Sequence, residues 1–198
     1  MNKEKQIGIL SIPVLVAALG YFVDIYDLLL FSIIRVPSLK SIGVSEVALL
    51  TDGEKIISTQ MIGLLLGGIL WGVIGDKKGR LSVLFGSILL YSVANIANGF
   101  VQTVNQYAFI RFIAGLGLAG ELGAGITLVS EMVPKEKRGI ATSLVAGIGL
   151  TGAVFAYFTF KYTDDWRLCY QIGGVLGFFL LVLRVKVAES FMFESVKL

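Results

Sequence analysis

Long apolar stretches, separated by short clusters of charge, constrain this chain more than any other feature. Hydrophobic residues make up 56% and charged residues 16% of the 198 residues, whereas a soluble domain carries about 25% charged residues. The mean hydropathy is +0.83. A helix needs ~20 apolar residues to cross a membrane, so the chain has room for about six spans. We therefore expect an all-α membrane protein with one six-helix transmembrane domain over residues 1–198.

The apolar runs and the punctuation between them place the spans. We expect them at residues 8–36, 57–75, 81–101, 106–132, 140–161 and 167–187. The longest connection, 37–56, is expected outside, whereas Asn105 and Asp164-Asp165-Trp166 mark short outer turns and Pro134 ends the fourth span. The first apolar run is too long for a signal peptide and has no small-residue cleavage site, so we expect no cleavable signal.

Basic residues are divided unequally between the two sets of loops. The larger group falls at ends that are cytoplasmic when the N-terminus is inside: Lys3, Lys5, Lys77, Lys78, Arg80, Lys135, Lys137, Arg138, Arg184, Lys186 and Lys197. The smaller group falls at the outer ends: Arg35, Lys40, Lys55, Lys161 and Arg167. Because basic residues concentrate in cytoplasmic loops, we expect both termini in the cytoplasm, in a bacterial plasma (inner) membrane. The same loops explain the pI of 9.0 without a nucleic-acid partner.

Few reactive side chains are available. The chain has no histidine, so any proton coupling must use carboxylates, and its single cysteine, Cys169, excludes an internal disulfide. No nucleotide-binding loop, metal-ligand cluster or nucleophile–base arrangement is recognisable in the sequence. We therefore expect neither an enzyme nor a cofactor or metal, with a proton gradient as the energy source.

Four charged residues fall well inside the expected spans. They are Asp24, Asp27, Arg111 and Glu121, and each would cost ~3 kcal/mol at the bilayer centre without a partner. Asp24 and Asp27 share one face of the first span because they are three residues apart. Arg111 lies at a similar depth in the fourth span, which predicts an ion pair between the two spans. The alternative to a working pair is a permanent salt bridge that only joins two helices.

Further polar residues are candidates for a substrate site. Glu121 is about 80° around the fourth span from Arg111 at ~100° per residue, so it could line the same cavity or bond to a neighbouring helix. Gln60, Asn95 and Gln171 are uncharged polar residues in spans and would suit a neutral substrate such as a sugar.

The loop between the second and third spans contains Gly72, Asp76, Lys77, Gly79 and Arg80. This spacing resembles the signature of the major facilitator superfamily, except that Leu81 stands where the family has a further basic residue. The segments 20–27 and 111–121 resemble spans 1 and 4 of proton-coupled phosphate and organic-acid symporters in that superfamily. The end of the fourth span also matches the family pattern, through Glu131, Pro134, Arg138 and Gly139.

The resemblance implies a function and roles for these residues. Transporters of the family have twelve spans in two related halves, so this chain would be an N-terminal half, itself a 3+3 inverted repeat. A carboxylate beside an arginine is the proton switch: Asp27, or alternatively Asp24, would release Arg111 when protonated, and Arg111 would then attract an anionic substrate. Arg111, Glu121 and Gln60 would bind substrate. A cytoplasmic gate would be formed by Gly72, Asp76, Lys77, Gly79, Arg80, Glu131 and Arg138.

One half alone would be expected to expose its charges to lipid, so the chain should pair with another half. A second copy, joined through the small residues of spans 2 and 5, is one partner and a separate C-terminal half is another; a truncated piece is a third reading. The main hypothesis is proton-coupled symport of a small organic anion or similar metabolite by alternating access. Sugar transport, facilitation without protons and a non-transporting membrane subunit stay open as alternatives.

Overall fold

The computed structural model describes residues 11–196, apart from the side chains of 13, 80–81, 122–132 and 187–196. Within this part of the chain the fold consists of six long α-helices and one short 3-10 helix, without strands. They are α1 (Ile12–Ser41), α2 (Leu49–Lys78), α3 (Arg80–Asn98), α4 (Val104–Met132), η1 (Lys135–Lys137), α5 (Arg138–Thr163) and α6 (Trp166–Val196). The all-α expectation is confirmed.

The connection between α1 and α2 is much shorter than the expected loop 37–56. That expectation is wrong, because α1 continues to Ser41 and α2 begins at Leu49. Pro37 lies inside α1, where its missing N–H removes only one helical hydrogen bond. The polar residues that follow Pro37, such as Ser38 and Lys40, are also compatible with a helix and do not end α1. An ion pair of 2.6 Å joins Lys40 Nζ, near the end of α1, to Glu46 Oε1 in the short link.

The other connections are as short as the sequence indicates. Gly79 joins α2 to α3 with a φ of +84°, a left-handed conformation that glycine adopts without steric cost. Its N–H donates to the carbonyl oxygen of Gly75 and closes the last turn of α2. α5 ends before Asp164, whose φ of 50° reverses the chain into α6. These turns fix the antiparallel order of successive helices.

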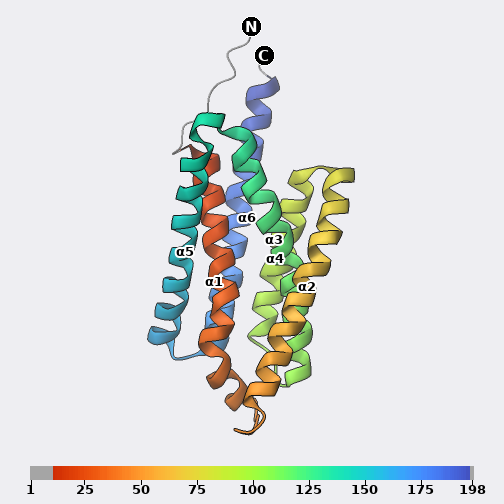
Figure 1. The fold of residues 1–198 in the computed structure, drawn as a ribbon, viewed down its shortest axis with the longest axis vertical. Coiled ribbons are helices and arrows are strands. Elements are labelled where there is room, and N and C mark those ends of the chain that lie inside the picture. The colour runs from red at the N-terminus through yellow and green to blue at the C-terminus, as the bar shows by residue number, and fades with distance from the viewer. Residues whose placement is uncertain (1–10, 197–198) are drawn as a thin grey trace.

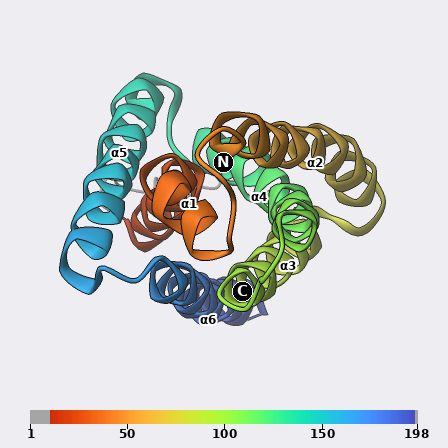
Figure 2. The ribbon, with the colours of Figure 1, turned by 90° about the horizontal axis from the view of Figure 1, so that it is seen from below.

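The helices pack so that α1 and α4 lie between α5 and α2. α1 packs against α5, α6 and α4, whereas α2 packs against α4, and α3 packs against α4 and α6. Viewed from below, α5 and α2 lie at opposite sides, with α3 and α6 along a third edge (Figure 2). α1 is the most buried of the long apolar helices, and α2 and α5 are the least buried.

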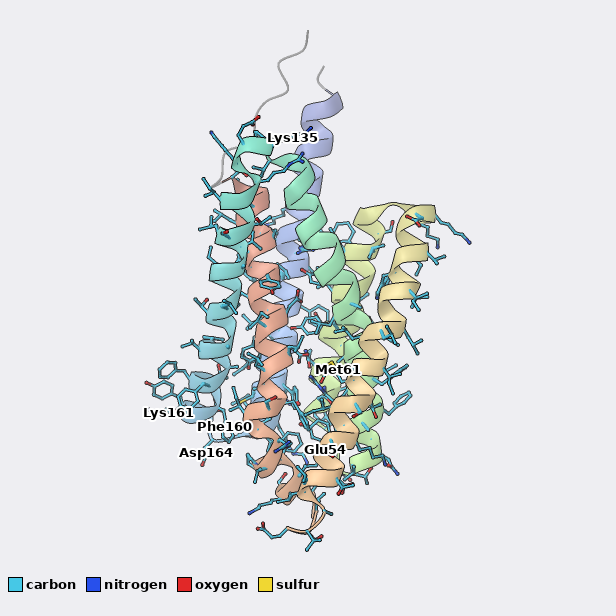
Figure 3. All side chains as sticks on the ribbon, in the orientation of Figure 1. Glu54, Met61, Lys135, Phe160, Lys161 and Asp164 are labelled. Atoms are coloured by element: carbon cyan, nitrogen blue, oxygen red, sulfur yellow. The ribbon has the colours of Figure 1, made fainter. Side chains whose placement is uncertain are left out.

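Connections alternate between the two ends of the bundle. α1 begins and α6 ends at the end that also holds the α2–α3 and α4–α5 connections (Figure 1). Lys135 lies at this end, whereas Lys161, Asp164 and Glu54 lie toward the opposite one (Figure 3). The start of α1 and the end of α6 therefore lie at the same end of the bundle. Which side of the membrane that is stays a prediction.

The exterior of the bundle is apolar along much of its length. Among the described residues, four helical segments are long and apolar enough to cross a membrane, and Ser82–Asn98 is a shorter apolar helix. Large hydrophobic side chains are exposed along α2 and α5, including Ile62, Leu65, Ile69, Leu150, Val154 and Tyr162. An exterior of this kind indicates an integral membrane protein. The count of six spans stays a prediction.

Candidate functional site

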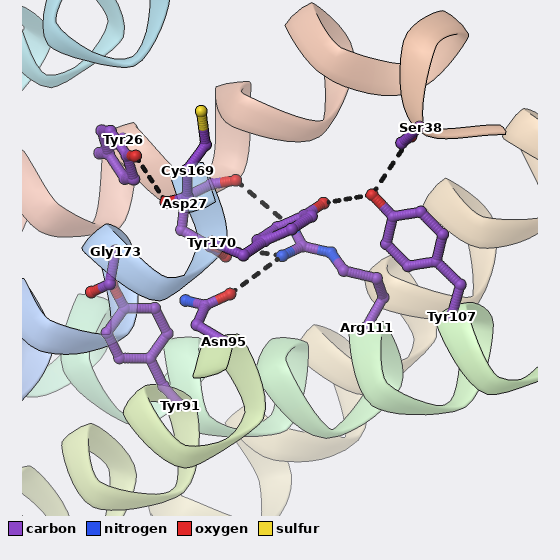
Figure 4. Close-up of polar contacts among 10 residues, drawn as sticks. All are labelled: Tyr26, Asp27, Ser38, Tyr91, Asn95, Tyr107, Arg111, Cys169, Tyr170 and Gly173. Atoms are coloured by element: carbon purple, nitrogen blue, oxygen red, sulfur yellow. Dashed lines mark hydrogen bonds and ion pairs between the residues drawn. The ribbon is translucent and has the colours of Figure 1, made fainter. Parts of the chain in front are cut away.

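An ion pair between α4 and α1 forms the centre of the site (Figure 4). Arg111 Nη1 lies 2.9 Å from Asp27 Oδ1, and Nη2 lies 3.4 Å from the Asp27 carbonyl oxygen. Both side chains are almost completely buried. The ion pair predicted from matched depth in the two spans is therefore present in the structure. Whether it acts in transport is a separate question.

Polar and aromatic side chains from α3, α4 and α6 surround the pair (Figure 4). Arg111 Nη1 also donates to Asn95 Oδ1 at 3.4 Å, and the guanidinium carbon lies 5.3 Å from the centre of the Tyr170 ring. The hydroxyls of Tyr107 and Tyr170 are 2.8 Å apart. These contacts hold Arg111 in one orientation but leave its Nε and Asp27 Oδ2 without hydrogen bonds among the described residues. Each of these two atoms can therefore form a hydrogen bond with a further polar ligand.

Asp24 lies close to this pair but forms no ion pair with the described side chains. It is 2% exposed, and its Oδ1 has no hydrogen-bond partner among the described residues. The nearby charged groups are Glu121, Arg184 and Asp27. Asp24 is therefore a buried carboxyl group near Asp27 on one side and near Glu121 and Arg184 on the other. Its Oδ1 accepts no hydrogen bond from the described residues.

A second buried ion pair joins α4 to α6. Arg184 Nη2 contacts Glu121 Oε1, and the pair lies against Gly20 of α1. Arg184 is only 7% exposed and so is buried in the bundle, whereas its expected place at a cytoplasmic end stays a prediction. Glu121 thus bonds to a neighbouring helix, as one of its two expected alternatives has it, and its place in the cavity of Arg111 stays a prediction. The sequence signal that could have found this second pair is the position of Arg184, more than four helical turns into an apolar run that begins at Trp166.

The expectation that one six-helix unit would expose these charges to lipid is also wrong. Arg111 and Asp27 are 0% exposed and Glu121 is 3% exposed in the single chain. Helices α1, α3, α4 and α6 enclose them without help from a second unit, because glycines allow the backbones to approach closely. A Cβ on Gly117 of α4 would lie 2.6 Å from the Tyr91 nitrogen of α3. Any need for a partner must therefore come from elsewhere.

Gln60 is buried in α2, against α4. It is 1% exposed, and a Cβ on Gly115 of α4 would overlap its backbone carbonyl oxygen. Its Nε2 has no hydrogen-bond partner among the side chains that the structure describes, and no described hydrogen bond joins it to Arg111. Its role in substrate binding stays a prediction.

The expected gate residues lie around two connections at one end of the bundle. Gly72, Asp76, Lys77 and Gly79 are exposed near the end of α2. The side chains of Arg80 and Glu131 lie outside the described residues, so their pairing stays a prediction. Arg138 Nε donates to the carbonyl oxygen of Val133 at 2.9 Å and fixes the entry into α5.

The small residues of α2 and α5 divide into inward and outward sets. Added Cβ atoms at Gly63 and Gly67 would overlap α4, and one at Gly149 would overlap the Tyr21 ring of α1. Gly68 and Gly72 instead face open space. Gly149 is therefore an internal packing residue, and the prediction that it lies in a dimer interface is wrong. Gly68 is still available for one.

Comparison with known proteins identifies relatives over most of the chain. A family model described as Major Facilitator Superfamily matches residues 11–192. The niacin transporter NiaP of Acinetobacter baylyi is 33% identical over 179 residues, which cover 88% of this chain and 40% of NiaP. The 4-hydroxybenzoate transporter PcaK of Pseudomonas putida is 32% identical over 146 residues, which cover 72% of this chain and 33% of PcaK.

Solved structures show the same fold. The proton:xylose symporter XylE of E. coli matches with a TM-score of 0.79 at 20% identity, over 88% of this chain and 44% of XylE. The chain thus spans less than half the length of these transporters. No relative or neighbour in this comparison is named as an enzyme.

Proposed function

The chain belongs to the major facilitator superfamily, and from that membership we propose that it is half of a proton-coupled symporter for a small organic anion. The proposed mechanism is alternating access, with Asp27, Asp24 and Arg111 as the coupling residues. The observation that carries the proposal is the buried Asp27–Arg111 pair between α1 and α4. A membrane protein retains buried charges of this kind mainly where they act on ions or substrates.

The chemistry of the pair supports coupling. A protonated Asp27 carries no charge, so the ion pair with Arg111 is lost when Asp27 binds the coupling proton. Once Asp27 is neutral, Arg111 keeps its charge because arginine does not lose its proton in proteins. Arg111 then becomes available to a carboxylate or phosphate, which its planar fork of donors can bind through two bonds.

Two observations bear on the substrate. The relatives named above transport niacin and 4-hydroxybenzoate, and each of these substrates carries a carboxylate that suits Arg111. A sugar is the second candidate, since the amide nitrogens of Gln60 and Asn95 have no hydrogen-bond partners among the described residues. Glu121 and Gln60 are proposed to contribute to the substrate site after the unit opens, since the charged pair is closed to solvent in this structure.

The proposed transporter needs a second six-helix unit, because NiaP and XylE are each more than twice as long as the part of them that this chain matches. A second copy of this chain or a separate C-terminal half would provide it, through the exposed faces of α2 and α5. We propose that the protein lies in the bacterial inner membrane, with its N- and C-termini in the cytoplasm. Asp76, Arg80 and Glu131 are proposed as the cytoplasmic gate, together with Gly72, Lys77, Gly79 and Arg138.

The alternative is a membrane subunit that keeps the fold without transporting. Uptake into proteoliposomes with an imposed pH gradient separates the two functions. Nicotinate, 4-hydroxybenzoate, phosphate and xylose serve as probes, and Glu54→Gln, at an exposed position of α2, is the matched control. Accumulation of one probe, dependent on the gradient, supports symport. Equilibration without accumulation supports facilitation, and no uptake of any probe contradicts the proposal for this chain alone.

A further inference from the structure

The buried charges of the bundle do not balance. Among the described residues, three buried carboxyl groups belong to Asp24, Asp27 and Glu121, and two buried guanidinium groups belong to Arg111 and Arg184. Arginine stays charged in proteins. If all three carboxyl groups were ionised, the interior would hold one uncompensated negative charge, which is costly to bury away from water. One proton bound to a carboxyl group removes this excess.

The ion pairs indicate which carboxyl group holds the proton. Asp27 is bonded to Arg111, and Glu121 is bonded to Arg184, so two carboxylates are each matched to one arginine. Asp24 is the third, and its Oδ1 has no hydrogen-bond partner among the described residues. A neutral carboxylic acid tolerates this position much better than a carboxylate does.

The charged groups near Asp24, among the described residues, come from α1, α4 and α6. Asp27 lies one turn along α1, Glu121 comes from α4 and Arg184 from α6. Tyr91 of α3 also lies near these carboxyl groups, and its hydroxyl donates to the carbonyl oxygen of Gly173 at 3.3 Å. A tyrosine hydroxyl is neutral near pH 7, so it adds no positive charge.

We propose that the five buried charged side chains form one charge-balanced set, in which Asp24 holds a single proton whenever both ion pairs are closed. The set consists of Asp24, Asp27, Glu121, Arg111 and Arg184. Glu121 and Arg184 are positioning residues in this set, because their pairing withholds Arg184 from Asp24. The proton on Asp24 is one helical turn from Asp27. It can pass to the Asp27 carboxylate, which releases Arg111 and leaves Asp24 ionised.

The set also determines how many protons accompany a substrate, a consequence that rests on the proposed function. A bound monovalent anion adds one negative charge beside Arg111. Charge balance then requires a second proton, so that Asp24 and Asp27 are both neutral in the loaded state. One proton enters with each monovalent anion, and the loaded and empty states carry the same net charge. A neutral substrate requires no additional proton.

Infrared spectroscopy of the purified 198-residue chain tests the resting proton without any need for transport. A protonated carboxylic acid gives a C=O stretching band that shifts in D₂O, and an ester-free detergent keeps that region clear. We expect this band in the wild type near neutral pH and its loss in Asp24→Asn. Glu54→Gln, at an exposed position, should leave the band unchanged.

Variants of the second ion pair test the balance itself. In Glu121→Gln, Arg184 is free to pair with ionised Asp24, so the band should disappear although Asp24 is still present. In Glu121→Gln/Arg184→Gln one carboxyl group and one guanidinium are removed together, so the band should return. If the single variant does not elute as a folded species, the double variant decides, and adding Asp24→Asn to it should remove the band.

Three results would overturn the inference: no such band in the wild type, a band that persists in Asp24→Asn, or a band that persists in folded Glu121→Gln. A failure of the proposed function looks different. In that case the band follows the charge count as predicted, but proteoliposomes show no uptake driven by a pH gradient.

Discussion

Gly20 of α1 lies directly against the carboxylate of Glu121 on α4, with the Arg184 guanidinium on the same spot. A Cβ at position 20 would overlap both Glu121 Oε1 and Arg184 Nη2. The closure of the second ion pair therefore depends on the absence of a side chain on a different helix. The backbone of α1 at Gly20 therefore sets how much room the Glu121–Arg184 pair has.

Gly20→Ala should destabilise the unit strongly, because the methyl group must separate a buried ion pair or displace α1. Breaking a buried pair costs about 3–5 kcal/mol. Thermal unfolding in detergent measures the loss. Gly147→Ala is the control, since Gly147 lies in α5 with open space around it, and alanine there should stabilise the helix by up to about 1 kcal/mol. Equal melting temperatures for the two variants would contradict the packing described here.

Gly149→Leu should impair the folding of the unit, whereas Gly68→Leu should impair only its pairing. Leucine at Gly149 would enter the Tyr21 ring, whereas Gly68 faces open space. Gly149→Leu should therefore lower the melting temperature of the single unit. Gly68→Leu should leave that temperature unchanged but weaken the proposed dimer, as measured by cross-linking or size-exclusion chromatography. Cross-links that map the contact to α3 and α6 would count against an interface through α2 and α5.

Asp76→Asn should loosen the proposed cytoplasmic gate and lower transport without unfolding the protein. Asp76 is exposed near the end of α2, so its replacement removes charge but little packing. Accessibility of an introduced cysteine near the α2–α3 turn reports the gate, and Glu54→Gln serves as the control. Uptake and accessibility that both stay at wild-type levels would remove Asp76 from the gate.

Uptake of nicotinate or 4-hydroxybenzoate should be insensitive to membrane potential if each anion enters with one proton. A potassium diffusion potential with valinomycin, at constant pH on both sides, sets the voltage across proteoliposomes. The initial rate should be the same at both polarities. A rate that rises when the inside is negative would indicate more than one proton per anion and would contradict the charge-balanced set.

Part of this site could be predicted from the sequence, because burying a charge in a membrane is costly enough to reveal itself. Asp27 and Arg111 are unlike charges at matched depth in two apolar runs, and the structure joins them at 2.9 Å. The helices likewise follow the apolar runs of the sequence. Short turns at Gly79 and Asp164 followed from glycine, charge and spacing.

The remaining features depend on information that apolar helices do not carry in one sequence. A span that faces lipid on one side and protein on the other is apolar all round, so periodicity does not show which face of α6 turns Arg184 inward. The length of α1 does not follow from the sequence, because Pro37 and the polar residues after it favour a loop. The different roles of Gly68 and Gly149 depend on helix orientation, which becomes visible only after packing.

Accumulation of substrate in proteoliposomes carrying Asp27→Asn is the most direct test of proton coupling through the Asp27–Arg111 pair. Asparagine resembles the protonated aspartate in shape and charge. We expect loss of uptake driven by a pH gradient, because an asparagine at this position cannot receive the proton that Asp24 passes on, with counterflow exchange of the same probe largely retained. Arg111→Ala should lose both activities, because it removes the attractor of the anion and leaves Asp27 without its partner. Uptake of the probe against its gradient by Asp27→Asn, at the wild-type pH dependence, would contradict the account.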